Sequence, residues 1–386
     1  MAGLLVLVQP TYAQITKIPH ADTTAGNAFG ASVAIDGNRA LVGASAEDVC
    51  GVNAGAAYVY EYDAPSLSWI KTARLVPNEC EEGSFFGRVL DLSGDRALIA
   101  ASAPYPSRAA RNSVYIFERD AETGNWAQVA RFIDERKEEE GSFGASVSLD
   151  GSVAVVTTAG DVLNHKYHGT AYVFEYDPVG DRWRRSARLR PSGKLQHGIF
   201  GGDAALQGGV LAVAASNYYL EKPGSVYLFE RDTEGTWQET QRLGDIRDIF
   251  ISLDLAEGWL LVGESQRGNG GSGRASFYKK EGKRWKLGQT LKPNTPYKLG
   301  AFGSTVAFNG ASALIAGYDE QLGKNFNIDR VVYEFKMNAE GRWTQRRIFD
   351  VGAVAFGYAL DAGSNFALIG EHSDQEPGAA YVVRLN

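Results

Sequence analysis

Residues 29–44 read FGASVAIDGNRALVGA, and residues 55–62 read GAAYVYEY. Apolar and polar side chains alternate in the first segment, an Asp-Gly pair follows it, and two apolar or aromatic segments come next. Trp69 opens a fourth segment of the same length. The pattern predicts four short strands. Neighbouring strands are expected to be antiparallel, because parallel pairing needs crossovers for which the chain has no room.

The same order of segments recurs from one end of the chain to the other. Phe-Gly marks six starts, and a degenerate Phe250-Ile251 fills the remaining gap, so repeats are roughly 50 to 57 residues long. Seven repeats of four strands predict an all-β fold, a seven-bladed β-propeller of four-stranded antiparallel blades. The starts lie near Phe29, Phe86, Phe143, Phe200, Phe250, Phe302 and Phe356.

The last repeat lacks its fourth segment. Repeats one to six each have a tryptophan at that place, expected to pack the outer sheets, whereas the seventh ends after GAAYVVRLN, residues 378–386. Residues 13–19, AQITKIP, precede the first Phe-Gly where a fourth strand would lie. We expect them to pair with residues 378–385 and close the ring, which removes two exposed sheet edges. The phased tryptophans are Trp69, Trp126, Trp183, Trp237, Trp285 and Trp343.

The N-terminus resembles the rear of a secretion signal. Residues 4–8 are apolar, and Thr11-Tyr12-Ala13 resembles a small-residue cleavage site. We therefore expect a signal remnant at residues 1–13 and one propeller at 14–386; the alternative is that the apolar run is a buried strand. No later stretch approaches the ~20 apolar residues of a membrane helix. The net charge of -7 is spread along the chain, without an evident basic patch. A secreted, periplasmic or cell-surface monomer that binds no nucleic acid is expected.

These repeats resemble FG-GAP repeats, the blades of the integrin α-subunit head and of many secreted microbial proteins. The alternative is a generic propeller of the WD or kelch type. The resemblance implies adhesion or recognition of a glycan or an extracellular protein. Near the Gly-Ala-Pro position of the family stand Val42-Gly43-Ala44, Ala100-Ala101-Ser102 and Val262-Gly263-Glu264.

Integrin-type blades often carry a calcium loop of Asp-x-Asp-x-Asp-Gly spacing between strands one and two. Here the corresponding turns are short, such as Asp36-Gly37-Asn38 and Asp150-Gly151. A lone Asp beside Gly is usually a turn former. We therefore expect no calcium, and no other metal or cofactor.

The long connections are expected on one end of the ring. Loops after strands two and four emerge together, and they are longer and more varied than the turns after strand one. We name this end the top face. Its histidine, aromatic and charged side chains suit recognition of a polar polymer or peptide, although they equally suit solvated loops. The candidate binding residues are His165, Tyr167, His168, His197, Tyr218, Tyr219, Arg267 and His372.

An enzymatic alternative rests on the loop of the third repeat. His165, Tyr167 and His168 would supply a base and a proton donor for a polysaccharide lyase, with Arg267 neutralising the acidic sugar. No nucleophile elbow, phosphate loop or Cys-x-x-Cys pair favours another reaction. A structural repeat protein with diffuse contacts is a third possibility.

Cys50 and Cys80 both fall on the top face, 30 residues apart. In an oxidising compartment they would form a disulfide that stabilises the fold by about 2 to 4 kcal/mol. The alternative is two unpaired thiols.

Overall fold

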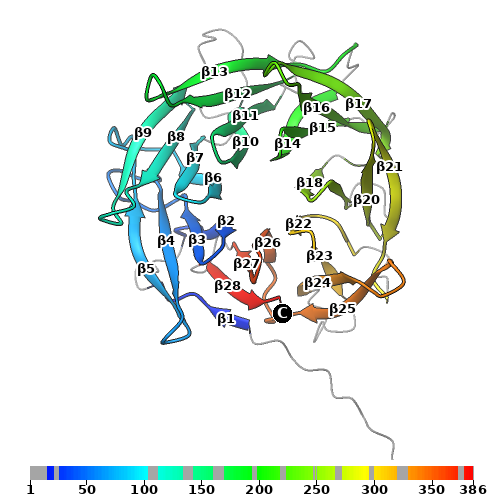
Figure 1. The fold of residues 1–386 in the computed structure, drawn as a ribbon. Coiled ribbons are helices and arrows are strands. Elements are labelled where there is room, and N and C mark those ends of the chain that lie inside the picture. The colour runs from blue at the N-terminus through cyan, green and yellow to red at the C-terminus, as the bar shows by residue number, and fades with distance from the viewer. Residues whose placement is uncertain are drawn as a thin grey trace, which may run out of the picture.

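The chain forms a closed ring of seven four-stranded antiparallel blades (Figure 1). The computed structural model describes residues 15–20, 26–102, 112–133, 142–159, 169–193, 198–217, 223–246, 248, 250–265, 272–294, 300–319, 329–372 and 378–385. The expected signal remnant at 1–13 lies outside them. Among these residues no helix is long and apolar enough to span a membrane. The predicted fold class is confirmed.

Each blade runs from an innermost first strand to an outermost fourth strand, in chain order. Blades one to three are β2(Phe29–Asp36), β3(Arg39–Ala44), β4(Ala56–Asp63), β5(Ser68–Leu75); β6(Phe86–Ser93), β7(Arg96–Ala101), β8(Ser113–Arg119), β9(Trp126–Ile133); and β10(Ser142–Asp150), β11(Val153–Ala159), β12(Thr170–Asp177), β13(Arg182–Leu189). Blades four to six are β14(Gly198–Gln207), β15(Val210–Asn217), β16(Gly224–Arg231), β17(Trp237–Ile246); β18(Ile251–Ala256), β19(Trp259–Glu264), β20(Arg274–Glu281), β21(Arg284–Leu291); and β22(Val306–Phe308), β23(Ser312–Asp319), β24(Asp329–Met337), β25(Trp343–Phe349).

Blade seven combines the two ends of the chain. Its first three strands are β26(Phe356–Ala362), β27(Phe366–Glu371) and β28(Ala379–Arg384), and its outer strand is β1(Ile15–Lys17). β1 is antiparallel to β28, with Ile15 opposite Val383. Ile18 extends the pairing by donating its N–H to the Ala380 carbonyl at 2.8 Å, and its side chain is buried. The predicted closure of the ring is confirmed.

Glycines bring the backbones of neighbouring blades together. At the seam, an added Cβ on Gly378 would lie 1.9 Å from the Phe29 carbonyl oxygen, and one on Gly30 would lie 2.0 Å from the Ala379 carbonyl oxygen. Gly30 also has a φ of 84°, which side chains rarely tolerate. The Phe-Gly tag therefore marks the joint at which one blade meets the next, and not only the start of a strand.

Among the described residues, seven apolar cores lie between neighbouring blades. Six contain the phenylalanine of a Phe-Gly tag, which is buried, and five of these six also include a strand-four tryptophan. The sixth, between blades six and seven, has Ile15 of β1 packed against it instead. Trp69 of blade one, for example, packs edge-on against Phe366 of blade seven at 5.4 Å. Packing of the outer sheets by these tryptophans is confirmed.

Blade five departs from the pattern. Phe250 is 69% exposed, and Ile246 and Ile251 fill the core between blades four and five. Asp254 accepts an N–H group of the next blade as Asp91 does, so the two aspartates occupy equivalent positions. Asp91 lies four residues after Gly87, and Asp254 lies four residues after Phe250. Phe250 therefore stands where other blades have the positive-φ glycine. A phenylalanine there is unsuited to the register shift that β2, β6, β10, β14 and β26 make at this point, and β18 pairs with β19 without a shift.

Candidate functional site

The lengths of the connections distinguish the two ends of the ring. Two residues separate Asp36 from Arg39 in the turn after strand one of blade one, and the equivalent turns of the other blades have two or three. The connection after strand two has six to eleven residues in every blade. Most long connections contain residues outside the described part of the chain, but that of blade one, residues 45–55, is described in full.

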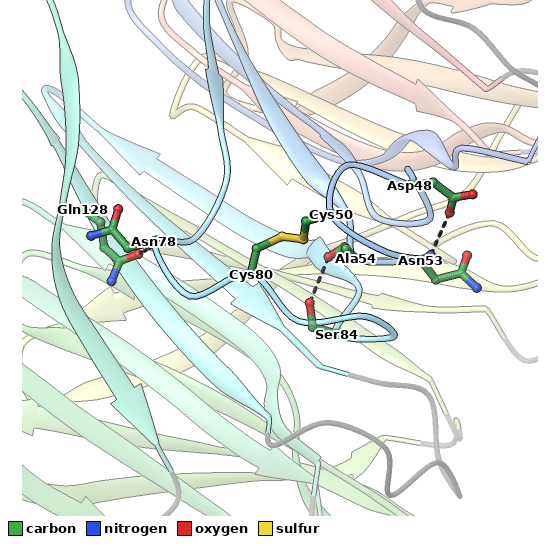
Figure 2. The surroundings of a disulfide bond; sticks show 8 residues. All are labelled: Asp48, Cys50, Asn53, Ala54, Asn78, Cys80, Ser84 and Gln128. Atoms are coloured by element: carbon green, nitrogen blue, oxygen red, sulfur yellow. Dashed lines mark hydrogen bonds between the residues drawn. A yellow bond between two sulfur atoms is a disulfide. The ribbon is translucent and has the colours of Figure 1, made fainter.

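A disulfide joins the blade-one loop to the connection between blades one and two (Figure 2). Cys50 and Cys80 are bonded, with their Cα atoms 6.3 Å apart, so the predicted pairing is confirmed. The two segments also share backbone hydrogen bonds: Gly83 donates to the Val52 carbonyl at 2.9 Å and Phe86 to the Ala54 carbonyl at 3.0 Å. Together they form one cross-linked platform on the top face.

A buried carboxylate holds the base of this platform. Both oxygens of Glu47 lie 2.7 Å from the Tyr58 hydroxyl, and Arg74 lies 3.7 Å away on the exposed side. Burial, followed by the hydrogen bond and charge of Glu47, raises the pKa of Tyr58, so this hydroxyl stays a donor. Val52, at the tip of the loop, is 56% exposed. The platform therefore presents a fixed backbone with an apolar side chain to solvent.

Most of the candidate binding residues fall outside the described residues: His165, Tyr167, His168, His197, Tyr218, Tyr219 and Arg267. The structure places His372, whose ring lies edge-on to Tyr358 with centroids 5.2 Å apart. Tyr358 is 49% exposed and lines the central channel, so His372 stands beside the channel in blade seven. His20 is partly buried and stacks on Phe29, at the core between blades seven and one, with ring centroids 3.9 Å apart.

The inner strands of all seven blades surround a central cavity of about 340 Å³. Aspartates, serines and a threonine dominate its polar lining, with Arg88 and Tyr358 also contributing. Each inner strand is the edge of its sheet, and its outward backbone N–H groups need acceptors. Side chains in the channel supply them.

One tier of side chains satisfies an N–H group in every blade. Asp91, Asp254 and Asp361 each accept two bonds, one from the next residue of their own strand and one from the inner strand of the following blade, and Ser148 accepts one. The seven donors, at 2.6 to 3.1 Å, are Ile35, Leu92, Leu149, Leu206, Leu255, Phe308 and Ala362. This tier, the channel clasp, links four pairs of neighbouring blades: seven to one, two to three, three to four and five to six.

The clasp gathers like charges. Burial raises the pKa of Asp91 to about 7, and the charge of Asp361 contributes. Burial and the charges of Asp361 and Asp91 raise the pKa of Asp254 well above its ordinary value. Burial also raises the pKa values of Asp361 and of Asp203, in the neighbouring tier, to about 6. The aspartates are half-buried, and their oxygens accept backbone N–H groups, so their role is structural.

The turn aspartates have a second role that turn chemistry alone did not indicate. Asp36 accepts the Gly94 N–H of blade two at 2.7 Å, and Asp150 accepts the Gly208 N–H of blade four at 2.7 Å. They join blades as the channel residues do. Within the described residues, no group of three or more histidine, cysteine, aspartate or glutamate side chains is arranged to hold a metal.

Sequence reasoning missed the channel aspartates because it examined turns and loops. A visible pattern existed: Asp91 and Asp361 both fall five residues after a tagged phenylalanine, as does Ser148. Aligning the repeats at that position shows acceptors in four blades and alanine in the other three, at Ala34, Ala205 and Ala307.

Comparison with known proteins gives one family. The model of the FG-GAP repeat matches residues 12–60 and 126–174. The first match includes the blade-one tag, and the second covers the outer strand of blade two and most of blade three. A search of curated proteins finds no significant match.

Proposed function

We propose that this chain, a seven-bladed β-propeller that carries FG-GAP repeats, is an exported binding protein that recognises a glycan or an extracellular protein through its top face. Residues 1–13 would be the remnant of its secretion signal, and residues 14–386 the binding domain. The observation that carries the proposal is the asymmetry of the ring: minimal turns at one end and long connections at the other.

The cross-linked platform of blade one supports this proposal. A disulfide between Cys50 and Cys80 and the hydrogen bond from the Ser84 hydroxyl to the Ala54 carbonyl, at 2.9 Å, restrict an exposed loop. Holding a loop rigid before binding lowers the entropy lost in the complex. A disulfide also fits an oxidising compartment.

Glycan-array binding of the full chain tests the proposal. Replacing His165, Tyr167 and His168 together by alanine should abolish binding, while V179A should leave it intact. Val179 is the matched control, since it is 95% exposed in the turn after strand three, at the opposite end of the ring. Equal binding by both variants would contradict a ligand site in the blade-three loop.

The second candidate, a polysaccharide lyase, rests on the same three residues and Arg267. Its test is the ultraviolet absorbance of unsaturated products released from an acidic polysaccharide. Turnover lost in the triple variant and retained in V179A would favour the enzyme, whereas binding without turnover would favour the recognition protein.

A further inference from the structure

Blade five carries a basic hairpin at the end of the ring opposite the top face. We name this end, where the turns after strands one and three lie, the bottom end. Residues 279–286 read KKEGKRWK, with five basic side chains and one acidic side chain, and they join β20 to β21. We name them the basic hairpin. The chain as a whole has a net charge of -7, so its overall charge conceals this local basic patch.

The basic hairpin has the shortest turn of its kind among the described strands. Two residues, Gly282 and Lys283, separate its strands, whereas four to six separate strands three and four in the other hairpins. Gly282 has a φ of 61°, as such a short turn requires. Longer turns are built on an aspartate that accepts N–H groups of the turn, as Asp120 does. Blade five has Glu281 there, which pairs with Lys286 instead, so its cations stand on regular strands with fixed spacing.

The charge at one position of strand three is reversed in blade five. The residue before the partner of the strand-four tryptophan is a glutamate in blades one to four, and each glutamate pairs with an arginine or lysine: Glu61, Glu118, Glu175 and Glu230. Blade five has Lys279 there, directly opposite Lys286. Like charges opposite each other destabilise a strand pair, and a bound anion would remove that repulsion. Blade six also has a lysine there, but Lys336 lies opposite Thr344 and 3.7 Å from Glu334.

Three cations share one face of the basic hairpin with a single carboxylate. Lys279, Arg284 and Lys286 lie on the same side as Glu281, because side chains alternate along each strand and paired residues share a face. Trp285 points the other way, into the core between blades four and five. The face with the three cations therefore looks toward blade six.

The carboxylate does not neutralise this face. Glu281 pairs with the β21 lysine at 2.7 Å, and both side chains are more than half exposed, so water screens the pair. The Lys279 ammonium lies 5.0 Å from the Trp259 ring centroid. Within the described part of the chain, the side chains of Lys283 and Arg284 form no ion pair or hydrogen bond, and both residues are exposed. These cations are accessible to a ligand.

The corresponding turns of blades one to four carry the opposite charge. An aspartate stands at the start of each turn and accepts an N–H group within it: Asp63, Asp120, Asp177 and Asp232. These bonds account for the aspartates without any partner. A flat anionic surface across the bottom end would meet their carboxylates, and like charges repel. A linear polyanion can follow the basic hairpin alone, so it fits this charge distribution better than a lipid bilayer does.

We propose that the basic hairpin of blade five binds a linear polyanion, an acidic polysaccharide whose carboxylates pair with Lys283, Arg284 and Lys286. The guanidinium of Arg284 can donate two parallel hydrogen bonds to one carboxylate, while the lysines act as point charges for its neighbours. Because a regular hairpin already holds the cations in place, little entropy is lost on binding. This site lies at the bottom end and does not depend on recognition by the top face.

Surface plasmon resonance of the full chain over immobilised polygalacturonate tests the proposal. The wild type should bind saturably, and neutral dextran on the same surface should bind none of it. R284Q/K286Q should weaken the affinity about tenfold, as expected for the loss of two exposed ion pairs. The variant should also make binding less dependent on salt, because fewer counterions are released.

R182Q/R184Q is the matched control, because it removes two charges from the same positions of blade three. Both arginines flank the blade-three tryptophan, as the two substituted residues of blade five flank theirs, and each lies opposite a carboxylate. This control should bind polygalacturonate as the wild type does. Replacing His165, Tyr167 and His168 should also leave this binding intact, so failure of the top-face proposal would not affect the result.

The proposal is overturned if the wild type does not bind polygalacturonate, or if R182Q/R184Q loses as much affinity as R284Q/K286Q. It is also overturned if R284Q/K286Q, shown by its thermal transition to be folded, binds as tightly as the wild type. Binding to phosphatidylglycerol vesicles in place of polygalacturonate would overturn it in favour of a membrane. Self-association in sedimentation velocity in place of that binding, abolished in R284Q/K286Q, would overturn it in favour of a second copy of the chain.

Discussion

Replacing Asp91 by serine is expected to make the stability of the propeller less dependent on pH. Asp91 accepts the N–H of Leu149 in the next blade at 2.6 Å. Ser148, at the same place one blade further, accepts the Leu206 N–H through its hydroxyl at 3.1 Å. A serine at position 91 can therefore keep the link between blades while removing the charge, although it gives up the bond to Leu92.

The magnitude follows from the raised pKa. Burial, assisted by the charge of Asp361, raises the pKa of Asp91 from 3.8 to about 7 in the folded protein. The folded state then holds the proton more tightly than the unfolded chain, so this stabilisation is full below pH ~4 and is lost as the pH rises to 7. From pH 5 to pH 8 the loss is at most about 2.7 kcal/mol at 1.36 kcal/mol per unit. Since Asp91 is partly exposed to the channel, solvent screening reduces this loss of stability to roughly 1–2 kcal/mol.

Urea unfolding at pH 5 and pH 8 measures this difference. The wild type should lose roughly 1–2 kcal/mol more than D91S between the two pH values. D150S is the control, because Asp150 links blades from an exposed turn, and Ser93 fills that place in blade two by accepting the Gly151 N–H at 3.0 Å. The D150S substitution should change the free energy of unfolding by the same amount at pH 5 and at pH 8. An identical pH dependence in the wild type and D91S would refute the idea that ionisation of the clasp opposes folding.

Three further variants test the seam and the platform. The double variant C50S/C80S should lower the free energy of unfolding by about 3 kcal/mol with an unchanged circular dichroism spectrum; an unchanged midpoint would contradict this. Deletion of residues 14–18 exposes the edge of β28 and removes buried Ile18, so it should cost far more stability than trimming a top-face loop, as thermal unfolding would show. G378A should prevent folding or lower the free energy of unfolding by several kcal/mol, whereas G37A, with nothing within 4 Å of its added Cβ, should lower it by about 1 kcal/mol or less. Similar melting temperatures for the two variants would contradict a close approach of neighbouring blades at Gly378.

The ring and its closure were predictable because they depend on periodic features. Strand alternation, the Phe-Gly tags and the tryptophans repeat in phase, so the one missing tryptophan locates the seam, and β1 fills it. Phe250 was harder to place. A phenylalanine near the expected start looks like a tag. Its burial, however, depends on a glycine and a register shift directly after it, and Phe250 is followed by neither.

The contacts between blades were not predictable from single repeats. Asp36 and Asp91 look alike in the sequence, each near a turn, yet one accepts a bond in solvent and the other lies in a channel with two like charges nearby. That difference arises only when seven blades close.

The proposed top-face site remains a prediction from loop length and residue type. Of its eight residues the structure describes His372, which stands beside the channel, while the predicted disulfide between Cys50 and Cys80 is confirmed. Loop sequences have no periodicity to read, so their residue types indicate chemistry but not position.

The channel clasp also means that the blades are not interchangeable. Blades with alanine in the clasp column, at Ala34, Ala205 and Ala307, are each followed by a blade whose own aspartate serves its own strand. Exchanging blades two and four would place Leu206 after Ala34 and leave its N–H without an acceptor. Circular permutation keeps every neighbour and should be tolerated, whereas shuffling or duplicating single blades should not. The sequence thus encodes an order of assembly within what looks like a uniform repeat.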